Sequence, residues 1–397
     1  KNKKYFKDIM NYIIFEDQFT HLLSPFSDFH ASFEIRCGQF ENIDRIISIL
    51  DPTDSITLIV RKELEEIISE KYNSLNVNPK NIMPGTWLNG ATLWDENTLE
   101  KISDGKVYAN EDILYGFSES NHVKLTDVKS LLIQKQEITF QIEFPHISFL
   151  WDAIRESKYQ LKEDFVKNFP ARYANIHHSV ILINDEKIYC SSNTNIRAGV
   201  IIDASNGPVI IEEDVKIDIG ALIKGPVYIG KGTKINLGCK LKGNVVIGPV
   251  CKIGGEIENS IIHGFSNKQH DGYLGHSYIG EWVNLGANTN TSNLKNNYNE
   301  IRFKFPLLEL VTKEIFIGAM IGDFVRTGIS TMLNTGSYIG IGANVFGGDF
   351  QNKMIPPFKW GRNDVVKWNK FIETCNKIKK RIVGIKLSAY NNEINHV

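Results

Sequence analysis

Hydrophobic residues in the second half of the chain recur with a period of six. A row of aliphatic residues repeats together with a row of small or β-branched residues placed two positions earlier. The aliphatic row is Ile211, Ile217, Ile223, Ile229, Ile235, Leu241, Ile247 and Ile253, and the small row is Val209, Val215, Ala221, Val227, Thr233, Cys239, Val245 and Cys251. Neither a helix nor an alternating strand has this period. The pattern predicts a hexapeptide-repeat parallel β-helix with both rows inside the prism.

The period is interrupted twice. The period resumes at Ile279 and Leu285, and then at Ile315, Ile321, Thr327, Leu333, Ile339 and Val345. The interruptions are residues 258–280, which contain three histidines, and residues 288–305, which are rich in asparagine. Because a solenoid tolerates insertions only on its surface, we expect both segments to be neighbouring surface insertions that carry the functional site.

The first half has the pattern of a mixed α/β domain. Residues 11–15, 55–60, 106–109 and 137–144 are rich in β-branched and aromatic residues and predict strands, and residues 61–72 have helical spacing. Apolar positions between 366 and 382 predict an amphipathic helix that caps the open end of the solenoid. We therefore expect an α/β domain over 1–170, a β-helix over 171–360, and a C-terminal helix and tail over 361–397.

Composition narrows the class of protein. The formal net charge is −1, and Lys and Arg are scattered among Asp and Glu, so no nucleic-acid-binding surface is expected. No apolar run is long enough to span a membrane, and the basic start turns acidic before a signal-like core develops, so we expect a soluble, cytoplasmic protein. The five cysteines form no CxxC pair, and we interpret them as reduced packing residues that give no zinc site.

The first interruption holds the residues with the clearest chemistry. A general base must titrate near neutrality beside groups that hold the substrate, and His270 has such company. The amide, cationic and acidic neighbours are Lys268, Asp271, Asn284, Asn293 and Lys295. Amides and cations bind sugar hydroxyls and phosphate. For His263 and His276 the alternative is an ordinary loop position, and the asparagine-rich segment could equally be a polar loop with Asx turns.

Long strings in this region resemble a known family. The strings are GPVYIGKGTKI, GGEIENSIIHGFSNKQHDGYLGHSYIGEWVNLGANTNTSNLKNNY, IGAMIGDFVRTGISTMLNTG and IPPFKWG, within residues 195–362. They look like the bifunctional UDP-N-acetylglucosamine pyrophosphorylase/glucosamine-1-phosphate N-acetyltransferase family, and more closely its divergent branch typical of Bacteroidetes. The resemblance implies a left-handed β-helix, acetyl-CoA as cofactor, and a homotrimer with sites shared between neighbouring prisms.

The same resemblance implies roles for single residues in the β-helix. His270 corresponds to the general base, Tyr273 to a substrate-phosphate contact, and Asn284 and Asn293 to sugar contacts. Acetyl-CoA would lie near Gly318, Ala319 and Ala343, while the base deprotonates the sugar amine as it attacks the thioester. Two places depart from the better-known branch: Leu294 replaces a tyrosine, and the sequence EIENS replaces a lysine-bearing coil.

The N-terminal half resembles the Rossmann-like nucleotidyltransferase portion of that branch. The matching strings are NYIIFED, LLSPFS, FEIRCG, WLNGATLW and FLWDAI. They imply transfer of a nucleotidyl group from UTP or dTTP to a sugar 1-phosphate with Mg²⁺, near Asp17, Arg36, Asn89 and Asp152. No GxGxxR loop is present, and Phe29 and His30 stand where the branch has a further arginine.

Three hypotheses remain open. The first is a transferase of sugar-nucleotide synthesis for cell-wall or surface polysaccharide, with nucleotidyl and acetyl transfer on one chain. The second is a sugar-1-phosphate nucleotidyltransferase whose β-helix only assembles or regulates it, so that His270 is dispensable. The third is a non-catalytic scaffold with decayed sites.

Overall fold

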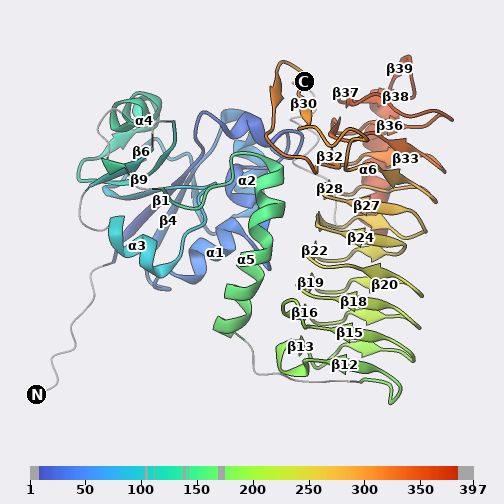
Figure 1. The fold of residues 1–397 in the computed structure, drawn as a ribbon. Helices are drawn as coiled ribbons and strands as arrows, with labels where there is room; N and C mark the ends of the chain where they lie inside the picture. The colour runs from blue at the N-terminus through green and yellow to red at the C-terminus, as the bar shows by residue number, and fades with distance from the viewer. Residues whose placement is uncertain are drawn as a thin grey trace, which may run out of the picture.

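An α/β domain and a tall prism of short strands make up the chain (Figure 1). The computed structural model describes residues 9–102, 106–110, 112–136, 140–141, 143–168 and 175–382. Helix α5 (Leu150–Asn168) runs between the domain and the prism. No helix within these ranges is long and apolar enough to cross a membrane.

The N-terminal domain is built on a seven-stranded mixed sheet of order β11-β8-β9-β7-β1-β4-β5. Its strands are β1 (Asn11–Phe15), β4 (Ser55–Ile59), β5 (Asn76–Val77), β7 (Gly85–Asn89), β8 (Val107–Ala109), β9 (Leu114–Glu119) and β11 (Phe140–Gln141). β1 pairs in parallel with β4 and β7, and β9 runs antiparallel to β7. The predicted strands are therefore present, and in the last one, 137–144, the described residues that form a strand are Phe140–Gln141.

Helices cover both faces of this sheet because its central strands are buried on both sides. In β1, Ile14 belongs to one hydrophobic core and Ile13 and Phe15 to another. α1 (Asn42–Ser48), α2 (Glu65–Lys71) and α3 (Glu96–Ile102) pack on the first core, and α4 (Val128–Gln136) packs on the second. Shorter elements are η1 (Thr20–Leu23), η2 (Ser32–Glu34), β2 (Arg36–Cys37), β3 (Phe40–Glu41), η3 (Lys62–Leu64), β6 (Asn81–Ile82), β10 (Val123–Lys124) and η4 (Leu125–Asp127).

The predicted β-helix has three faces of parallel strands. The first face contains β12 (Ile181–Ile183), β15 (Ile201–Asp203), β18 (Leu222–Lys224), β21 (Lys240–Leu241), β24 (Glu256–Glu258) and β27 (Tyr273–Gly275), followed by β29 (Asn290–Thr291) and β34 (Met332–Leu333). The second contains β13 (Ile188–Cys190), β16 (Val209–Ile211), β19 (Val227–Ile229), β22 (Val245–Ile247), β25 (Ser260–Gly264), β28 (Tyr278–Glu281), β32 (Ala319–Ile321), β35 (Ser337–Ile339) and β37 (Met354–Ile355).

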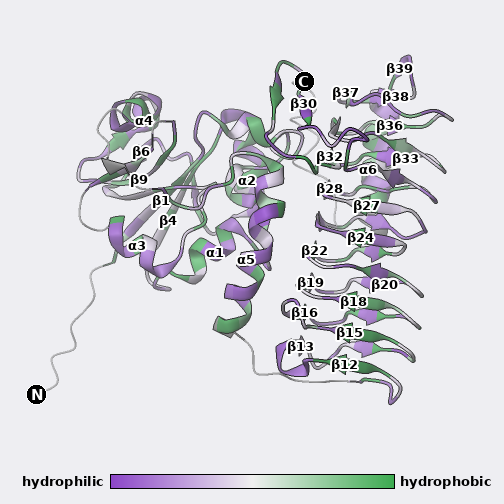
Figure 2. Cartoon of the chain, in the orientation of Figure 1, coloured by the Kyte–Doolittle hydropathy of each residue, from purple (hydrophilic) through white to green (hydrophobic). Residues whose placement is uncertain are grey.

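The third face contains β14 (Asn195–Ile196), β17 (Lys216–Ile217), β20 (Lys234–Ile235), β23 (Lys252–Ile253) and β26 (Asn267–Lys268), and continues through a bridge at Asn284 to β33 (Arg326–Thr327), β36 (Asn344–Val345) and β38 (Lys359–Trp360). At its end, β39 (Asp364–Val365) pairs antiparallel with β38. The two predicted inward rows form the dry core of the prism. In Figure 2 its wall is coloured in both green and purple over its whole height, because hydrophobic and hydrophilic residues alternate along the short strands.

The first predicted insertion is wrong. Residues 258–280 stay in the wall as parts of β24 to β28, so no loop leaves the prism there. The phase of the repeat is lost because a coil is shortened: Ile235 pairs with Ile253, 18 positions on, but Ile253 pairs with Lys268, 15 positions on. A deletion within a coil breaks the six-residue pattern as thoroughly as an insertion does.

The second predicted interruption does leave the prism. After β29 the chain extends into an antiparallel hairpin of β30 (Arg302–Lys304) and β31 (Glu309–Val311) and returns at β32. Ile315 lies on the returning arm and is 43% exposed, so its predicted inward position is wrong. The hairpin packs Phe303 against Trp151 of α5 and Tyr338 of β35.

The second face of the prism is covered by the N-terminal domain. Its outward residues form one hydrophobic core with α5 and the loop before β2. The outward row includes Ile210, Tyr228, Val246, Ile261, Tyr278, Met320 and Tyr338, and the facing residues include Phe26, Ile35, Trp151 and Ile154. The domain and the prism therefore share a continuous core.

The predicted C-terminal helix is α6 (Trp368–Ile382). Phe371 and Cys375 on its apolar side pack with Trp282, Phe324 and Phe29. Trp282 follows β28 of the second face and Phe324 precedes β33 of the third face, so α6 lies against the corner between these faces.

Candidate active sites

A cavity of about 740 Å³ opens at the carboxyl ends of β1 and β4 in the N-terminal domain. Its apolar lining includes Phe15, Ile59, Leu114, Val128 and Leu132. Its polar lining includes Glu16, Asp17, Arg61, Lys62, Asn78 and Lys129. The carboxyl edge of parallel strands is where α/β sheets hold their ligands. An apolar cavity with a few convergent charges suits a nucleotide base with an attached phosphate group.

Asp17 and Asn89, two predicted nucleotide-site residues, meet at this edge. Asp17 follows β1 and Asn89 ends β7, and Asn89 donates from Nδ2 to Asp17 Oδ2 at 2.8 Å. His146 lies beside them, with Nε2 3.9 Å from Asp17 Oδ2 and Nδ1 3.1 Å from the Thr92 hydroxyl. Burial lowers the pKa of His146 to about 4, although Asp17 opposes this shift. The histidine is therefore neutral at neutral pH.

Arg36 and Asp152, the other two predicted residues, lie elsewhere. Arg36 is buried between the domain and the prism, where it donates to His263 O at 3.1 Å, Gln39 O at 2.7 Å and Glu41 Oε1 at 3.0 Å. Asp152 accepts from the backbone N–H groups of Ser148 and Phe149 and pairs with Arg155 at the start of α5. The structure does not bring these two side chains to the cavity.

Arg61 is one of three cavity cations that sequence reasoning missed, together with Lys62 and Lys129. It follows β4, and its guanidinium pairs with Glu16 at 3.2 Å and donates to Ser27 O at 2.6 Å. Its position directly after a strongly predicted strand is a sequence signal that could have identified it, because strand ends carry the site in such sheets.

In the prism, Tyr273 and Asn293 meet at the corner between the first and second faces. Asn293 donates from Nδ2 to Tyr273 Oη at 2.9 Å and to His276 Nδ1 at 2.8 Å, and Tyr273 donates to Glu258. Gly275 makes room for this arrangement, since a Cβ there would lie 2.2 Å from Tyr273 Oη. Burial lowers the pKa of His276, whose ring stacks on Phe316 with centroids 5.0 Å apart. Sequence reasoning assigned His276 no role.

His270 lies at a different corner, between the third and first faces. It is exposed on the turn from β26 to β27, next to the exposed Asp271. Lys268 does not point outward with it: its side chain is buried inside the prism, and Nζ donates to His270 O at 2.5 Å and to Gly254 O at 3.3 Å. Burial lowers the pKa of Lys268 to about 8. Lys268 therefore holds the backbone of the turn that presents His270.

The remaining predicted residues are spread over the other faces. Asn284 is exposed on the third face and accepts from Asn267 at 3.3 Å, beside a cavity of about 470 Å³ against α6. Lys295 donates to Glu300 O within its own loop at 2.6 Å. Within one chain, His270, Asn284 and Asn293 do not converge on one point.

The three predicted acetyl-CoA residues are parts of the wall. Ala319 and Ala343 are fully buried in the core of the prism. Gly318 has no room for a side chain, since a Cβ would lie 2.0 Å from Gly275 O. Only the backbone at these positions could line a groove for an acyl carrier.

The fold and these sites define a chain in which an α/β domain, with a cavity at the carboxyl ends of its parallel strands, is joined to a β-helix of hexapeptide repeats. Residues 12–168 match the model of the sugar nucleotidyl transferase family. Among known proteins, the bifunctional sugar-1-phosphate nucleotidylyltransferase/acetyltransferase of Sulfurisphaera tokodaii is 30% identical over 264 residues, covering 64% of this chain and 59% of that protein. The bifunctional protein GlmU of Methanococcus aeolicus is 41% identical over 95 residues, covering 22% of each chain.

The chain thus spans 59% and 22% of the lengths of these two relatives. Among solved structures, a hexapeptide transferase family protein from Anaplasma phagocytophilum matches at 15% identity and a TM-score of 0.17, over 56% of this chain and 93% of that one. The chain is therefore similar over part of its length to a bifunctional nucleotidylyltransferase/acetyltransferase, while the β-helix itself is established by the pairing of its own strands.

Proposed function

We propose that the chain is a transferase of sugar-nucleotide synthesis that transfers a nucleotidyl group from UTP or dTTP to a sugar 1-phosphate in its N-terminal domain. The cavity at the carboxyl ends of β1 and β4, inside the region matched by the family, carries this proposal. The apolar part suits the base, and Arg61, Lys62 and Lys129 suit the phosphates. Asp17, partly exposed at the cavity, is the carboxylate that could hold Mg²⁺.

The test is pyrophosphate release from UTP and dTTP with a panel of sugar 1-phosphates. We expect release with one pair, and a loss of at least 100-fold in Asp17→Asn. Asp218→Asn, on the exposed third face of the prism, is the matched control and should retain the native rate. Absence of release with every pair contradicts this half of the proposal.

For the prism we propose acetyl transfer from acetyl-CoA to an amino-sugar 1-phosphate, with His270 as base. Its exposure at a corner, on a turn fixed from inside by Lys268, supports this role. The separation of His270 from Asn284 and Asn293 within one chain supports a homotrimer in which neighbouring prisms complete the site. We assign the chain to the divergent Bacteroidetes-type branch on the strings around His270.

Thiol release from acetyl-CoA measures this second activity. A general base contributes about 10²–10⁴-fold, so His270→Ala should lose that factor with the preferred amino sugar. His178→Ala removes an exposed histidine before β12 and serves as the control. Thiol release that is unchanged in His270→Ala would contradict the role of His270 and favour a β-helix that serves only in assembly. If neither thiol nor pyrophosphate is released, the chain is a non-catalytic scaffold.

A further inference from the structure

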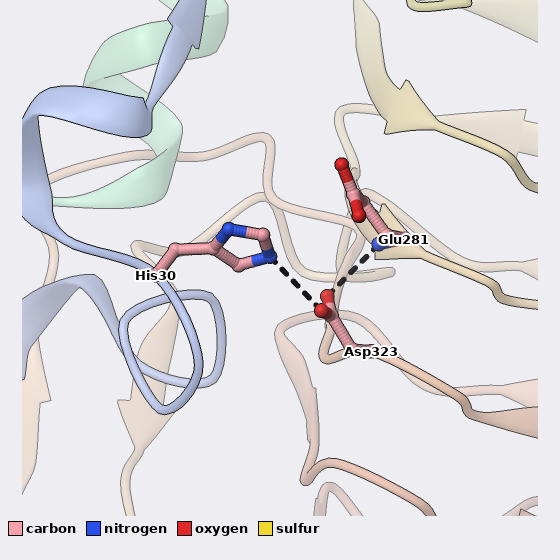
Figure 3. Close-up of side chains that lie close together, drawn as sticks. All are labelled: His30, Glu281 and Asp323. Atoms are coloured by element: carbon pink, nitrogen blue, oxygen red, sulfur yellow. Dashed lines mark hydrogen bonds and ion pairs between the residues drawn. The ribbon is translucent and has the colours of Figure 1, made fainter. Parts of the chain in front are cut away.

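A group of ionisable side chains is buried where the N-terminal domain meets the second face of the prism. His30, from the loop before η2, points at Asp323 of the prism, with Nε2 2.9 Å from Oδ2 (Figure 3). Asp323 Oδ1 accepts from the backbone N–H of Glu281 at 2.8 Å. One ligand atom from each of His30, Glu281 and Asp323 lies within 4.8 Å of the others. His30 and Asp323 are 3% and 1% exposed.

Glycines of the prism create the space for this group. Gly280 and Gly322 follow Ile279 and Ile321, which are paired, and so occupy one outward row of the second face. A Cβ at Gly280 would lie 2.3 Å from Asp323 Oδ1, and a Cβ at Gly322 would lie 3.0 Å from Pro25. The hollow is therefore shaped to take the carboxylate and the loop that carries His30.

His263 occupies the same outward row one coil earlier. Its ring nitrogens are independent evidence for a bound ligand at this place. Its side chain is fully buried, and neither ring nitrogen has a hydrogen bond to any residue that the structure describes. Its ring centroid lies 5.1 Å from that of His30. The nearest carboxylate oxygen, Glu41 Oε1, lies 3.9 Å from Nδ1. A buried imidazole without a hydrogen bond is costly, and a metal ion would satisfy it.

The charged side chains around the group favour a bound cation. Arg36 and Lys71 pair with Glu41 and Glu34, which leaves Glu281 and Asp323 with His30 as their nearest cationic group. A divalent ion held between the three side chains would balance the two carboxylates.

We propose that His30, Glu281 and Asp323 bind a divalent transition-metal ion, for which zinc is the best fit, and that His263 lies beside them as a further nitrogen donor. Imidazole nitrogen with carboxylate oxygen is a donor set that zinc accepts, at about 2.0–2.2 Å from each atom. Since one ligand comes from the domain and two from the prism, the ion links the two parts of the chain. The site is separate from His270, and it adjoins the cavity of the N-terminal domain, where Arg61 donates to His30 O at 3.2 Å.

Metal binding is tested on the full chain, freed of metal by a chelator and dialysed against ZnCl₂ alone. We expect one zinc per chain by elemental analysis, and an increase of several degrees in the unfolding temperature, because an ion that binds only the folded state stabilises it. Asp323→Asn and His30→Gln should each weaken zinc affinity at least tenfold. The control replaces His177 and His178 with Gln, since this exposed pair, with rings 4.2 Å apart, is the alternative place for zinc.

The outcomes separate a built site from surface binding. Stoichiometric zinc that is lost in Asp323→Asn and kept in the His177/His178 control supports the proposal. Absence of zinc binding by the native chain at 100-fold molar excess overturns it, as does binding that only the His177/His178 control loses. If Asp323→Asn and His30→Gln do not fold, the native stoichiometry and this control decide the matter. None of these readouts depends on enzymatic activity.

Discussion

At the scale of single residues, Lys268 is a charged residue at an inward repeat position, and it holds a turn of the prism. It stands in the inward row of the third face, in register with Ile217, Ile235 and Ile253, where every other coil of that stretch has an isoleucine. Its ammonium group reaches two backbone carbonyls at the corner instead of lying in the dry core. A buried cation of this kind costs stability and is retained for what it holds, which here is the turn of His270.

Lys268→Met should change the pH dependence of stability. Burial lowers the pKa of Lys268 to about 8 in the folded chain, against about 10.4 when unfolded. Between these values the unfolded state binds the extra proton, so the native chain gains stability as pH rises, by up to about 3 kcal/mol. The variant lacks this gain. Between pH 7 and pH 10, urea unfolding should therefore show the free energy of unfolding of the native chain rising relative to that of Lys268→Met. A difference between the two chains that is the same at both pH values would contradict the assigned burial.

Single residues also mark the limit of what sequence predicts. Asp17 and Asn89 could be nominated because each ends a recognisable strand, and the structure joins them. Arg36 could not be placed, because its partner His263 lies 227 positions away and no local pattern reveals a contact between domain and prism. His146, His276 and His263 were equally hidden, since each gains its surroundings only from tertiary contacts.

At the scale of elements, the period of six predicted the prism almost coil by coil. It succeeded because the inward rows must be apolar and because each coil stacks on the last. It failed at residues 258–280, where a coil shortened by three positions shifts the phase yet keeps its strands paired. The hairpin of β30 and β31 was seen only as an interruption, since its own residues carry no six-residue signal.

The hairpin is predicted to fasten α5 to the prism. Phe303 is fully buried, and its ring lies 5.1 Å from that of Trp151. Phe303→Ala should lower the free energy of unfolding by about 3–5 kcal/mol, because truncation leaves a cavity. Leu307, at the tip of the hairpin, is 100% exposed. Leu307→Ala should therefore change the free energy of unfolding by less than about 0.5 kcal/mol. Equal effects of the two changes, measured by chemical denaturation, would refute the assigned packing.

At the scale of the whole molecule, the N-terminal domain determines which parts of the prism remain open. It covers the second face, and α6 lies at the corner between the second and third faces. The corner between the third and first faces is left exposed, and apolar residues stand on it: Ile219, Leu237 and Ile329 are 52%, 74% and 79% exposed. This is the corner that carries His270, and a further prism would fit there.

The proposed trimer should therefore depend on that corner. Leu237→Glu places a charge in the expected contact and should raise the trimer dissociation constant at least tenfold, as followed by light scattering across a dilution series. Val166→Glu, on α5, is the control at a similarly exposed apolar position, 82% exposed, and should leave the trimer intact. A native chain that is monomeric at every concentration would contradict the trimer. A trimer unaffected by Leu237→Glu would show that its contact lies elsewhere on the prism.

The central claim is that one chain carries both nucleotidyl and acetyl transfer. The most direct measurement supplies the purified chain with acetyl-CoA, UTP or dTTP, Mg²⁺ and a panel of amino-sugar 1-phosphates, and identifies the products by mass spectrometry. We predict a nucleotide-linked N-acetyl sugar from one combination, loss of its acetyl group in His270→Ala, and loss of its nucleotide in Asp17→Asn. Recovery of the substrates unchanged from every combination would contradict the account.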